Sequence, residues 1–555
     1  MQKKWWNNKI AYQIYPKSFY DSNGDGIGDI NGIIQKLDYL KDLGIDIIWI
    51  SPVYQSPMVD QGYDISDYYK IHPMFGTMTD MERLIAEIKK RDMYLLMDLV
   101  INHCSDQHEW FQKALQDLEG EYADYFYIKE GKDGKPPTNW RSYFGGSAWE
   151  KIGDTNKYYL HMFAKEQPDL NWENKKVREK LYEMVNWWLE KGIDGFRIDA
   201  IINIKKQLDF KNYEADDIDQ LSSLHKMLEE VTDVGEFLTE LRDNTFKKYD
   251  AFTVAEVFDD KPGELGKFIG DNGYFSTIFD FTIEKERAGN TWEKLPYLSA
   301  EQIKKLIFSA QKESEKIGFR ANIIENHDEP RGATVFFEEG ISSKQGTKMI
   351  GTISMLLKGI PFLYQGQELG MTNISFGDIS EVDDISTKDQ YLLMIKKGYS
   401  KEEALRIANV KSRDNARTPF QWSTAKNAGF TSGTPWLKVN PNYKEINVQE
   451  EEKDKLSVLS YYKKLIQLRK RKDLEDAIVY GEFREAYSDK KNILAYYRIG
   501  EYHKILVLAN YQEKEYQISL EDEIKEIVLS NYEDVEIKEG KVILKPYEVV
   551  VLQCL

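Results

Sequence analysis

The sequence predicts an α/β protein: a (β/α)8 barrel with a small domain inserted after the third strand and an antiparallel β-domain at the C-terminal end. Two observations predict this architecture. Eight short apolar or β-branched runs alternate with segments of helical periodicity, which is typical of repeated βα units around a parallel sheet. From about Ala477 onward, closely spaced short strands replace this alternation. The 555 residues exceed a bare barrel of about 250 residues, so further domains are expected.

The barrel strands can be placed in order from their apolar runs. They are expected at residues 10–15, 45–50, 94–100, 195–198, 252–255, 277–281, 321–324 and 361–364. Residues 31–43 and 79–91 carry apolar side chains near i, i+3, i+4 and i+7 and are expected to be helices between strands. Eight strands with helices between them predict a closed barrel.

Two connections are too long for simple loops. Residues 104–171, rich in Tyr, Trp, Gly and Pro, are expected to form the inserted domain, which leaves 1–103 and 172–476 for the barrel. A second excursion, residues 372–447, follows the eighth strand and is expected to contain a helix and Gly/Pro/Asn-rich loops. Both would lie over the same end of the barrel. Residues 477–555 are expected to form a β-sandwich domain.

Charge and cysteine usage exclude several classes of protein. The net charge of -18, without a lysine-rich tract, argues against nucleic acid or anionic membrane partners. Cys104 and Cys554 lie far apart, without the spacing of metal ligands or a disulfide framework. No secretory signal or membrane span is apparent, so a cytoplasmic protein, monomeric or weakly dimeric, is expected.

Carboxylates follow three of the predicted strands. Asp199 ends the run Gly-Phe-Arg-Ile-Asp, Glu256 follows Val-Ala, and Asp328 closes Glu-Asn-His-Asp. The carboxyl ends of barrel strands converge on one mouth, so the three acids are expected to face one pocket. A solitary acid at a strand end is more often structural or solvated, but three in matching positions favour a reactive site.

Retaining glycoside hydrolysis requires such a set. One carboxylate attacks the anomeric carbon while a second carboxyl group, about 5 Å away, protonates the leaving oxygen. Arg197, two residues before Asp199, would keep that nucleophile ionised. Partial burial and nearby negative charge would raise the pKa of Glu256. Asp328 would bind sugar hydroxyls and stabilise the oxocarbenium-like transition state.

The motifs resemble glycoside hydrolase family 13, the α-amylase family, and within it the oligo-1,6-glucosidase and α-glucosidase branch. The matching segments are Asp-Leu-Val-Ile-Asn-His (98–103), Gln-Pro-Asp-Leu-Asn-Trp (167–172), Gly-Phe-Arg-Ile-Asp-Ala (195–200), Val-Ala-Glu-Val (254–257) and Glu-Asn-His-Asp (325–328). The resemblance implies that Asp199 is the nucleophile, Glu256 the acid/base and Asp328 the transition-state stabiliser.

The resemblance also implies a substrate-binding set. His103, Arg197 and His327 would bind the first glucose, and Tyr63 would be its stacking platform. Asp60 and Arg413 would clamp the terminal 4-hydroxyl and close the pocket, which makes the enzyme exo-acting. Gln167 and Ala200 complete the residues assigned to substrate binding.

The segment Asp-Ser-Asn-Gly-Asp-Gly-Ile-Gly-Asp (21–29) places oxygen atoms on alternate residues, as calcium-binding loops do. The side chains of Asp21, Asn23, Asp25 and Asp29, with the Ile27 carbonyl, are expected to hold a structural Ca²⁺ or Mg²⁺ ion. The alternative is a metal-free loop of Asx turns. The α-amylase family's common calcium site is not defined by Asn102 alone. No organic cofactor and no catalytic metal is expected.

Residue 200 bears on the linkage that is cleaved. In this branch Val at that position accompanies α-1,6 cleavage, whereas Ala or Thr accompanies α-1,4 cleavage. Ala200 therefore favours maltose and short malto-oligosaccharides over isomaltose, by a modest margin. Sucrose-acting and trehalose-6-phosphate-acting enzymes and transglucosylases stay open, although residues 332–340 lack the arginine-rich loop of the sucrose isomerases. A non-catalytic relative, such as a transporter heavy subunit, would lack part of the carboxylate set.

Overall fold

The computed structural model describes residues 3–258, 261–288, 291–341 and 343–555. Its centre is a parallel sheet in the order β13-β12-β10-β5-β2-β1-β15-β14, closed by a bridge between Phe279 and Ala321. The strands are β1 (Ala11–Ile14), β2 (Ile47–Ile50), β5 (Tyr94–Leu99), β10 (Gly195–Ile198), β12 (Phe252–Ala255), β13 (Thr277–Ile278), β14 (Ala321–Asn322) and β15 (Ile360–Tyr364). The predicted (β/α)8 barrel, with all eight expected strands, is confirmed.

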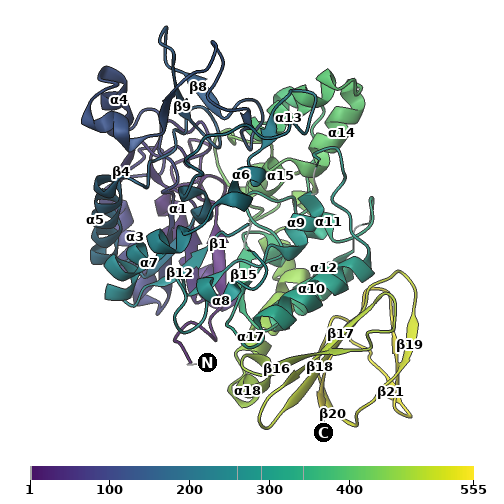
Figure 1. Ribbon diagram of the computed structural model, residues 1–555. Helices are drawn as coiled ribbons and strands as arrows, with labels where there is room; N and C mark the ends of the chain where they lie inside the picture. The colour runs from purple at the N-terminus through teal and green to yellow at the C-terminus, as the bar shows by residue number, and fades with distance from the viewer. Residues whose placement is uncertain (1–2, 259–260, 289–290, 342) are drawn as a thin grey trace.

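Helices cover the outside of the barrel (Figure 1). Every residue of β1, β2, β10 and β12 is buried, as in parallel sheets covered on both faces. The covering helices include α3 (Met78–Lys90), α5 (Lys175–Lys191), α7 (Val234–Asn244), α10 (Ala300–Ser314), α12 (Lys344–Leu356) and α17 (Val458–Arg469). The helix expected at 31–43 is divided at Lys36, whose φ of -108° separates α1 (Ile30–Gln35) from α2 (Leu37–Leu43).

The inserted domain is built around the antiparallel strands β6 (Ile128–Glu130), β9 (Lys157–Leu160) and β8 (Trp149–Lys151). A segment beyond the predicted limits of 104–171 also belongs to it. Strand β11 (Ser222–Ser223), from the loop after β10, pairs with β7 (Trp140–Arg141), and Phe210 packs against Trp140. The loop that begins at the end of β10 is therefore fixed to the inserted domain.

The excursion after β15 contains more helix than expected. Instead of one helix it forms a hairpin of α13 (Ile385–Lys396) and α14 (Lys401–Lys411), followed by the short α15 (Asp414–Arg417). Tyr391 and Met394 of α13 pack against Ala404 and Ile407 of α14. Figure 1 shows this hairpin and the inserted domain at the same end of the barrel.

The C-terminal domain lies at the opposite end (Figure 1). It has a five-stranded antiparallel sheet, β16-β17-β18-β23-β20, and a three-stranded sheet, β19-β22-β21, whose apolar side chains share one core. The strands are β16 (Glu482–Ala486), β17 (Ile493–Ile499), β18 (Lys504–Asn510), β19 (Tyr516–Ser519), β20 (Ile524–Ser530), β21 (Ile537–Lys538), β22 (Lys541–Leu544) and β23 (Val549–Cys554). None of the helices in the described ranges is both long and apolar enough to cross a membrane.

Candidate active site

Strand register places the first two carboxylates next to each other. Ile198 of β10 pairs with Ala255 of β12, so Asp199 and Glu256 are the next residues along neighbouring strands. Such strands lie about 4.8 Å apart, close to the carboxyl separation of about 5 Å in retaining glycosidases. The approach of the strands depends on Gly195, where a Cβ would lie 1.8 Å from the Phe252 carbonyl oxygen.

Arg197 joins the carboxylates of this half of the site. Its Nη1 lies 2.7 Å from Asp199 Oδ1 and 2.8 Å from Asp98 Oδ1, and its Nη2 lies 2.9 Å from Glu256 Oε1. The other Glu256 oxygen accepts a 3.1 Å hydrogen bond from the backbone N–H of Ala200. One guanidinium group therefore faces three buried carboxyl groups.

The excess of negative charge favours protonation of two of them. Burial, reinforced by the charges of Asp199 and Asp328, raises the pKa of Glu256 to about 8 despite the Arg197 cation. Burial and Asp199 also raise the pKa of Asp98 to about 7. Glu256 therefore carries a proton at neutral pH, as a general acid must.

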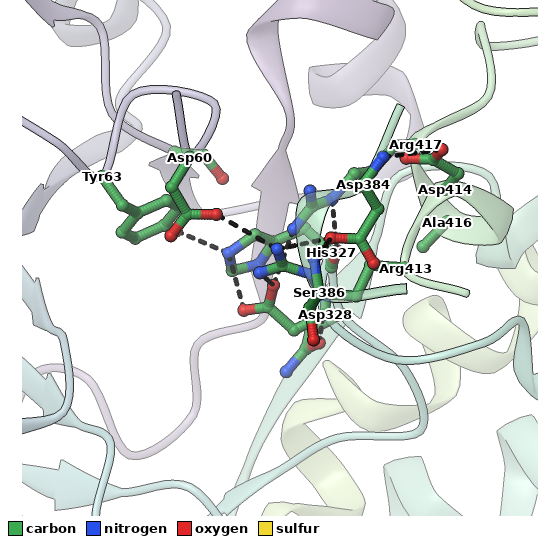
Figure 2. A network of polar contacts seen from close by, with 12 residues as sticks. Asp60, Tyr63, His327, Asp328, Asp384, Ser386, Arg413, Asp414, Ala416 and Arg417 are labelled. Atoms are coloured by element: carbon green, nitrogen blue, oxygen red, sulfur yellow. Dashed lines mark hydrogen bonds and ion pairs between the residues drawn. The ribbon is translucent and has the colours of Figure 1, made fainter. Parts of the chain in front are cut away.

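The third carboxylate, Asp328, sits in the opposite electrostatic environment (Figure 2). Its Oδ1 accepts hydrogen bonds from Arg417 at 2.8 Å and Arg413 at 3.2 Å, and its Oδ2 lies 3.0 Å from His327 Nε2. Although burial disfavours the charge, His327 and the two arginines hold the pKa of Asp328 well below its usual range. Asp328 is therefore ionised at neutral pH.

Arg413 joins Asp328 to two further carboxylates from distant segments. It donates to Asp60 Oδ1 at 3.1 Å and, from Nη2 and Nε, to Asp384 Oδ1 at 2.6 and 2.9 Å. Asp384 is the N-cap residue of α13, and Arg413 follows the end of α14. The helical hairpin is thus tied to the barrel loop that carries Asp60 (Figure 2).

The remaining predicted binding residues lie between these two groups. Tyr63 stacks on His327 with ring centroids 5.3 Å apart, and its hydroxyl bonds to Asp98 at 3.0 Å. Gln167 Nε2 lies 3.2 Å from Asp60 Oδ2 and 3.2 Å from His103 Nε2. All the predicted catalytic and substrate-binding residues therefore lie at this end of the barrel. Their individual roles stay predictions.

Sequence reasoning missed three residues of this network. Asp98 is the first residue of the quoted segment 98–103, and Arg417 lies four residues after the predicted Arg413, so each was close to a residue or motif that was named from the sequence. Asp384 lies in the long excursion, where the sequence gives no comparable signal. Its contact with Arg413 depends on how the hairpin folds back, which local sequence does not determine.

The loop of residues 21–29 is hydrogen-bonded within itself, and among the described residues no group of three acidic, histidine or cysteine side chains is placed to hold a metal ion. The backbone N–H groups of residues 23, 25 and 27 donate to the side-chain oxygens of Asp21, Asn23 and Asp25 at 2.9–3.0 Å. Asx turns are the alternative that the sequence left open for this loop, and they engage side-chain oxygens of Asp21, Asn23 and Asp25, so the bound ion stays a prediction. Asp29 accepts from Ser22 and caps α1 through Gly32.

A buried lysine lies between the barrel and the inserted domain. Lys206 Nζ is 2.7 Å from Asp169 Oδ2 and 2.8 Å from Asn102 Oδ1, and it also donates to the Asn203 carbonyl. Asp169 and Lys206 are almost completely buried. The ammonium group therefore supplies a positive charge next to Asn102, where the sequence left a second calcium site undefined.

Comparison with known proteins agrees with this geometry. The family model for the α-amylase catalytic domain matches residues 13–481, and that for the C-terminal domain of the α-amylase SusG matches residues 493–551. The chain therefore belongs to the α-amylase family, glycoside hydrolase family 13, and is a glycoside hydrolase.

Relatives of several specificities match along their full length. An oligo-1,6-glucosidase of Parageobacillus thermoglucosidasius is 44% identical over 99% of this chain and 98% of that protein. The trehalose-6-phosphate hydrolase of Bacillus subtilis is 40% identical over 99% of this chain and 98% of that protein. Among solved structures, the isomaltulose synthase of Protaminobacter rubrum superposes with a TM-score of 0.95 at 40% identity, with both chains covered completely.

Proposed function

We propose that the protein is a retaining, exo-acting α-glucosidase that releases glucose from the non-reducing end of short α-glucosides. The observation that carries this proposal is the pair Asp199 and Glu256, side by side on β10 and β12 and held by the same guanidinium group. A carboxylate next to a protonated carboxyl group is the arrangement that retaining hydrolysis requires.

The reaction follows from these protonation states. Asp199 Oδ attacks the anomeric carbon while Glu256 gives its proton to the glycosidic oxygen, so the C–O bond breaks and the aglycone leaves as an alcohol. Glu256, now a carboxylate, removes a proton from a water molecule that hydrolyses the glucosyl ester of Asp199. Asp328, which is ionised at neutral pH, stabilises the positive charge that develops on the sugar ring in both steps.

The contacts of Arg413 support exo-action. Arg413 contacts Asp60 on the barrel side and Asp384 on the hairpin side, and it also contacts Asp328. A polymer that continued past the first glucose would have to displace these ion pairs. The pocket therefore fits a chain end, and each cleavage releases one glucose.

For the linkage, we favour maltose and short malto-oligosaccharides over isomaltose. Ala200 is buried next to the nucleophile and donates its N–H to Glu256, so its small side chain leaves more room for a 4-linked ring than Val would. The relatives described above include an oligo-1,6-glucosidase, and its name supports the runner-up, oligo-1,6-glucosidase activity. One side chain shifts such a preference by only about 1–3 kcal/mol.

Glucose release from maltose and isomaltose at matched concentrations tests the proposal, with Asp199→Ala as the blank. Faster release from maltose supports the α-1,4 preference, and faster release from isomaltose makes the enzyme an oligo-1,6-glucosidase with the same mechanism. Release from neither, together with turnover of sucrose or trehalose 6-phosphate, contradicts the proposed substrate class but keeps the carboxylate chemistry.

We further propose that the loop of residues 21–29 holds a structural Ca²⁺ ion, or Mg²⁺, through Asp21, Asn23, Asp25, Asp29 and the Ile27 carbonyl. Oxygen ligands on alternate residues suit a hard cation, which would supply positive charge to balance the loop carboxylates. Removal of the ion by EDTA should lower Tm, and CaCl₂ should restore it. An unchanged Tm, or restoration by neither ion, contradicts the metal assignment.

The cytoplasmic location and the monomeric or weakly dimeric state are also proposals. The acidic composition and the two buried, unpaired cysteines support a reducing compartment. Sedimentation velocity over a range of protein concentrations tests the oligomeric state.

A further inference from the structure

The mouth of the barrel is bordered by two bodies that the chain builds separately. One consists of the inserted domain together with the loop after β10, joined by the β7·β11 pairing. The other is the α13–α14 hairpin, on which Trp292 and Leu295 from the connection between α9 (Thr282–Ala288) and α10 also pack. The pocket-closing residues Asp384 and Arg413 stand at the two ends of this hairpin.

An acidic loop, residues 214–219 with the sequence Glu-Ala-Asp-Asp-Ile-Asp, faces the hairpin from the first body. Its anchor to the inserted domain is Arg141, which binds Asp219 through Nε at 2.8 Å and Nη2 at 2.7 Å, and Asp216 through Nη1 at 2.6 Å. The planar guanidinium group fixes the loop in a defined position. Asp217, between these two residues, is left to face outward from the anchor.

Lys397 connects the acidic loop to the hairpin. Its Nζ lies 2.8 Å from Asp217 Oδ2 and 2.9 Å from Glu293 Oε1, and the three side chains are only 18%, 26% and 16% exposed. Lys397 is the C-cap residue of α13, where the helix dipole also favours a cation. Glu293 and Lys397 belong to the hairpin body, so the pair between Lys397 and Asp217 is a contact that crosses between the bodies.

We infer that Lys397 is a positioning residue that latches the hairpin to the acidic loop and thereby limits the length of leaving group that the mouth admits. The inference rests on the proposed exo-glucosidase function. A second contact crosses nearby, since the Arg413 guanidinium lies over the Phe144 ring at 5.1 Å. The contact between Arg413 and Phe144 belongs to the pocket itself. The Lys397 latch lies outside the set of residues that bind the first glucose, and it acts on the sugar units beyond that glucose.

Chain-length dependence distinguishes a latch from a merely structural lysine. Lys397→Met should leave kcat/KM for maltose nearly unchanged and raise the ratio of kcat/KM for maltopentaose to that for maltose by about threefold to tenfold. Lys396 is the exposed neighbour of Lys397, so Lys396→Met is the matched control and should keep the wild-type ratio. Asp217→Asn should reproduce the change, and the double variant should add little to either single one. High salt should move the wild-type ratio in the same direction.

Equal loss of activity on both substrates, or a change in Lys397→Met that Asp217→Asn does not share, would overturn the inference. A second measurement is independent of substrate. Hydrogen exchange of peptides covering 209–223 and 392–400 should be faster in Lys397→Met than in Lys396→Met. Wild-type inactivity on both maltose and maltopentaose would contradict the proposed function alone, whereas unchanged exchange rates would refute the latch whatever the substrate.

Discussion

Replacement of Arg413 by Ala should test whether the closed pocket depends on one side chain. The guanidinium group joins Asp60, Asp328 and Asp384, whose side chains are 6%, 32% and 1% exposed. Loss of one partner from a buried ion pair costs about 3–5 kcal/mol. The lower end applies here, because Asp328 keeps Arg417 and Asp60 keeps a hydrogen bond from Gln167.

Taken as lost stabilisation of the transition state, about 3 kcal/mol corresponds to a loss of about 150-fold in kcat/KM for maltose, since 1.36 kcal/mol is a factor of ten. Initial rates of glucose release well below KM measure this ratio directly. Arg413→Lys should recover little, because one ammonium group cannot reproduce the forked contacts. Asp384→Asn removes the contact that orients Arg413 and should cost about tenfold. Activity of Arg413→Ala within about fivefold of wild type, with an unchanged melting temperature, would refute the role of Arg413 in pocket closure.

Three further predictions concern the acid/base, the domain junction and the linkage. Because Glu256 acts in its protonated form and its pKa is raised to about 8, kcat/KM should fall as pH rises through about 8, and a pH profile with a falling limb near 5 would contradict this assignment. Lys206→Met leaves Asp169 buried without its cation and should lower the free energy of unfolding in urea by about 3–5 kcal/mol. Adding Asp169→Asn should recover part of this loss. Equal stability of wild type and Lys206→Met would exclude a structural role for Lys206. Ala200→Val should move the maltose to isomaltose preference toward isomaltose by up to about 100-fold, and an unchanged preference would exclude this side chain from the selection of linkage.

The sequence was sufficient for the barrel because its signals are local. Each of the eight strands is a short apolar run between helical segments, and the carboxylates follow strands directly, so topology alone brings Asp199, Glu256 and Asp328 together. The break at Lys36 was not predictable in this way, since residues 31–43 keep one helical periodicity across it. The second helix of the hairpin was within reach of local reasoning, because Ser400 and Glu403 form a capping box at the start of α14 and good helix formers follow them.

Contacts between distant segments were beyond local reasoning. Asp384 and Arg413 are 29 residues apart and become partners only because the hairpin doubles back on itself. The pairing of β11 with β7, which attaches the loop after β10 to the inserted domain, has the same origin. Asp98 is a different case, because the motif that contains it was visible in the sequence. Only the strand register, which places Asp98 opposite Arg197, showed that Asp98 shares the Arg197 guanidinium group with Asp199 and Glu256.

The site divides its charges between two arginine centres, and this division agrees with the proposed chemical roles. At Arg197, one cation faces the three carboxyl groups of Asp98, Asp199 and Glu256, so burial and mutual repulsion favour bound protons on Glu256 and Asp98. At Asp328, His327 together with the two cations Arg413 and Arg417 lowers the pKa and keeps the carboxylate ionised.

Glu256 and Asp328 thus have the same chemical group in different protonation states. Glu256 shares one arginine with two other carboxyl groups and holds a proton, whereas Asp328 has two arginines and stays ionised. Addition of a cation at the first centre should remove the general acid, and loss of a cation at the second should let Asp328 compete for the proton. The pH profile of Arg413→Ala therefore carries information beyond its rate. If Asp328 is held ionised by these arginines, the acidic limb of that profile should shift to higher pH relative to wild type.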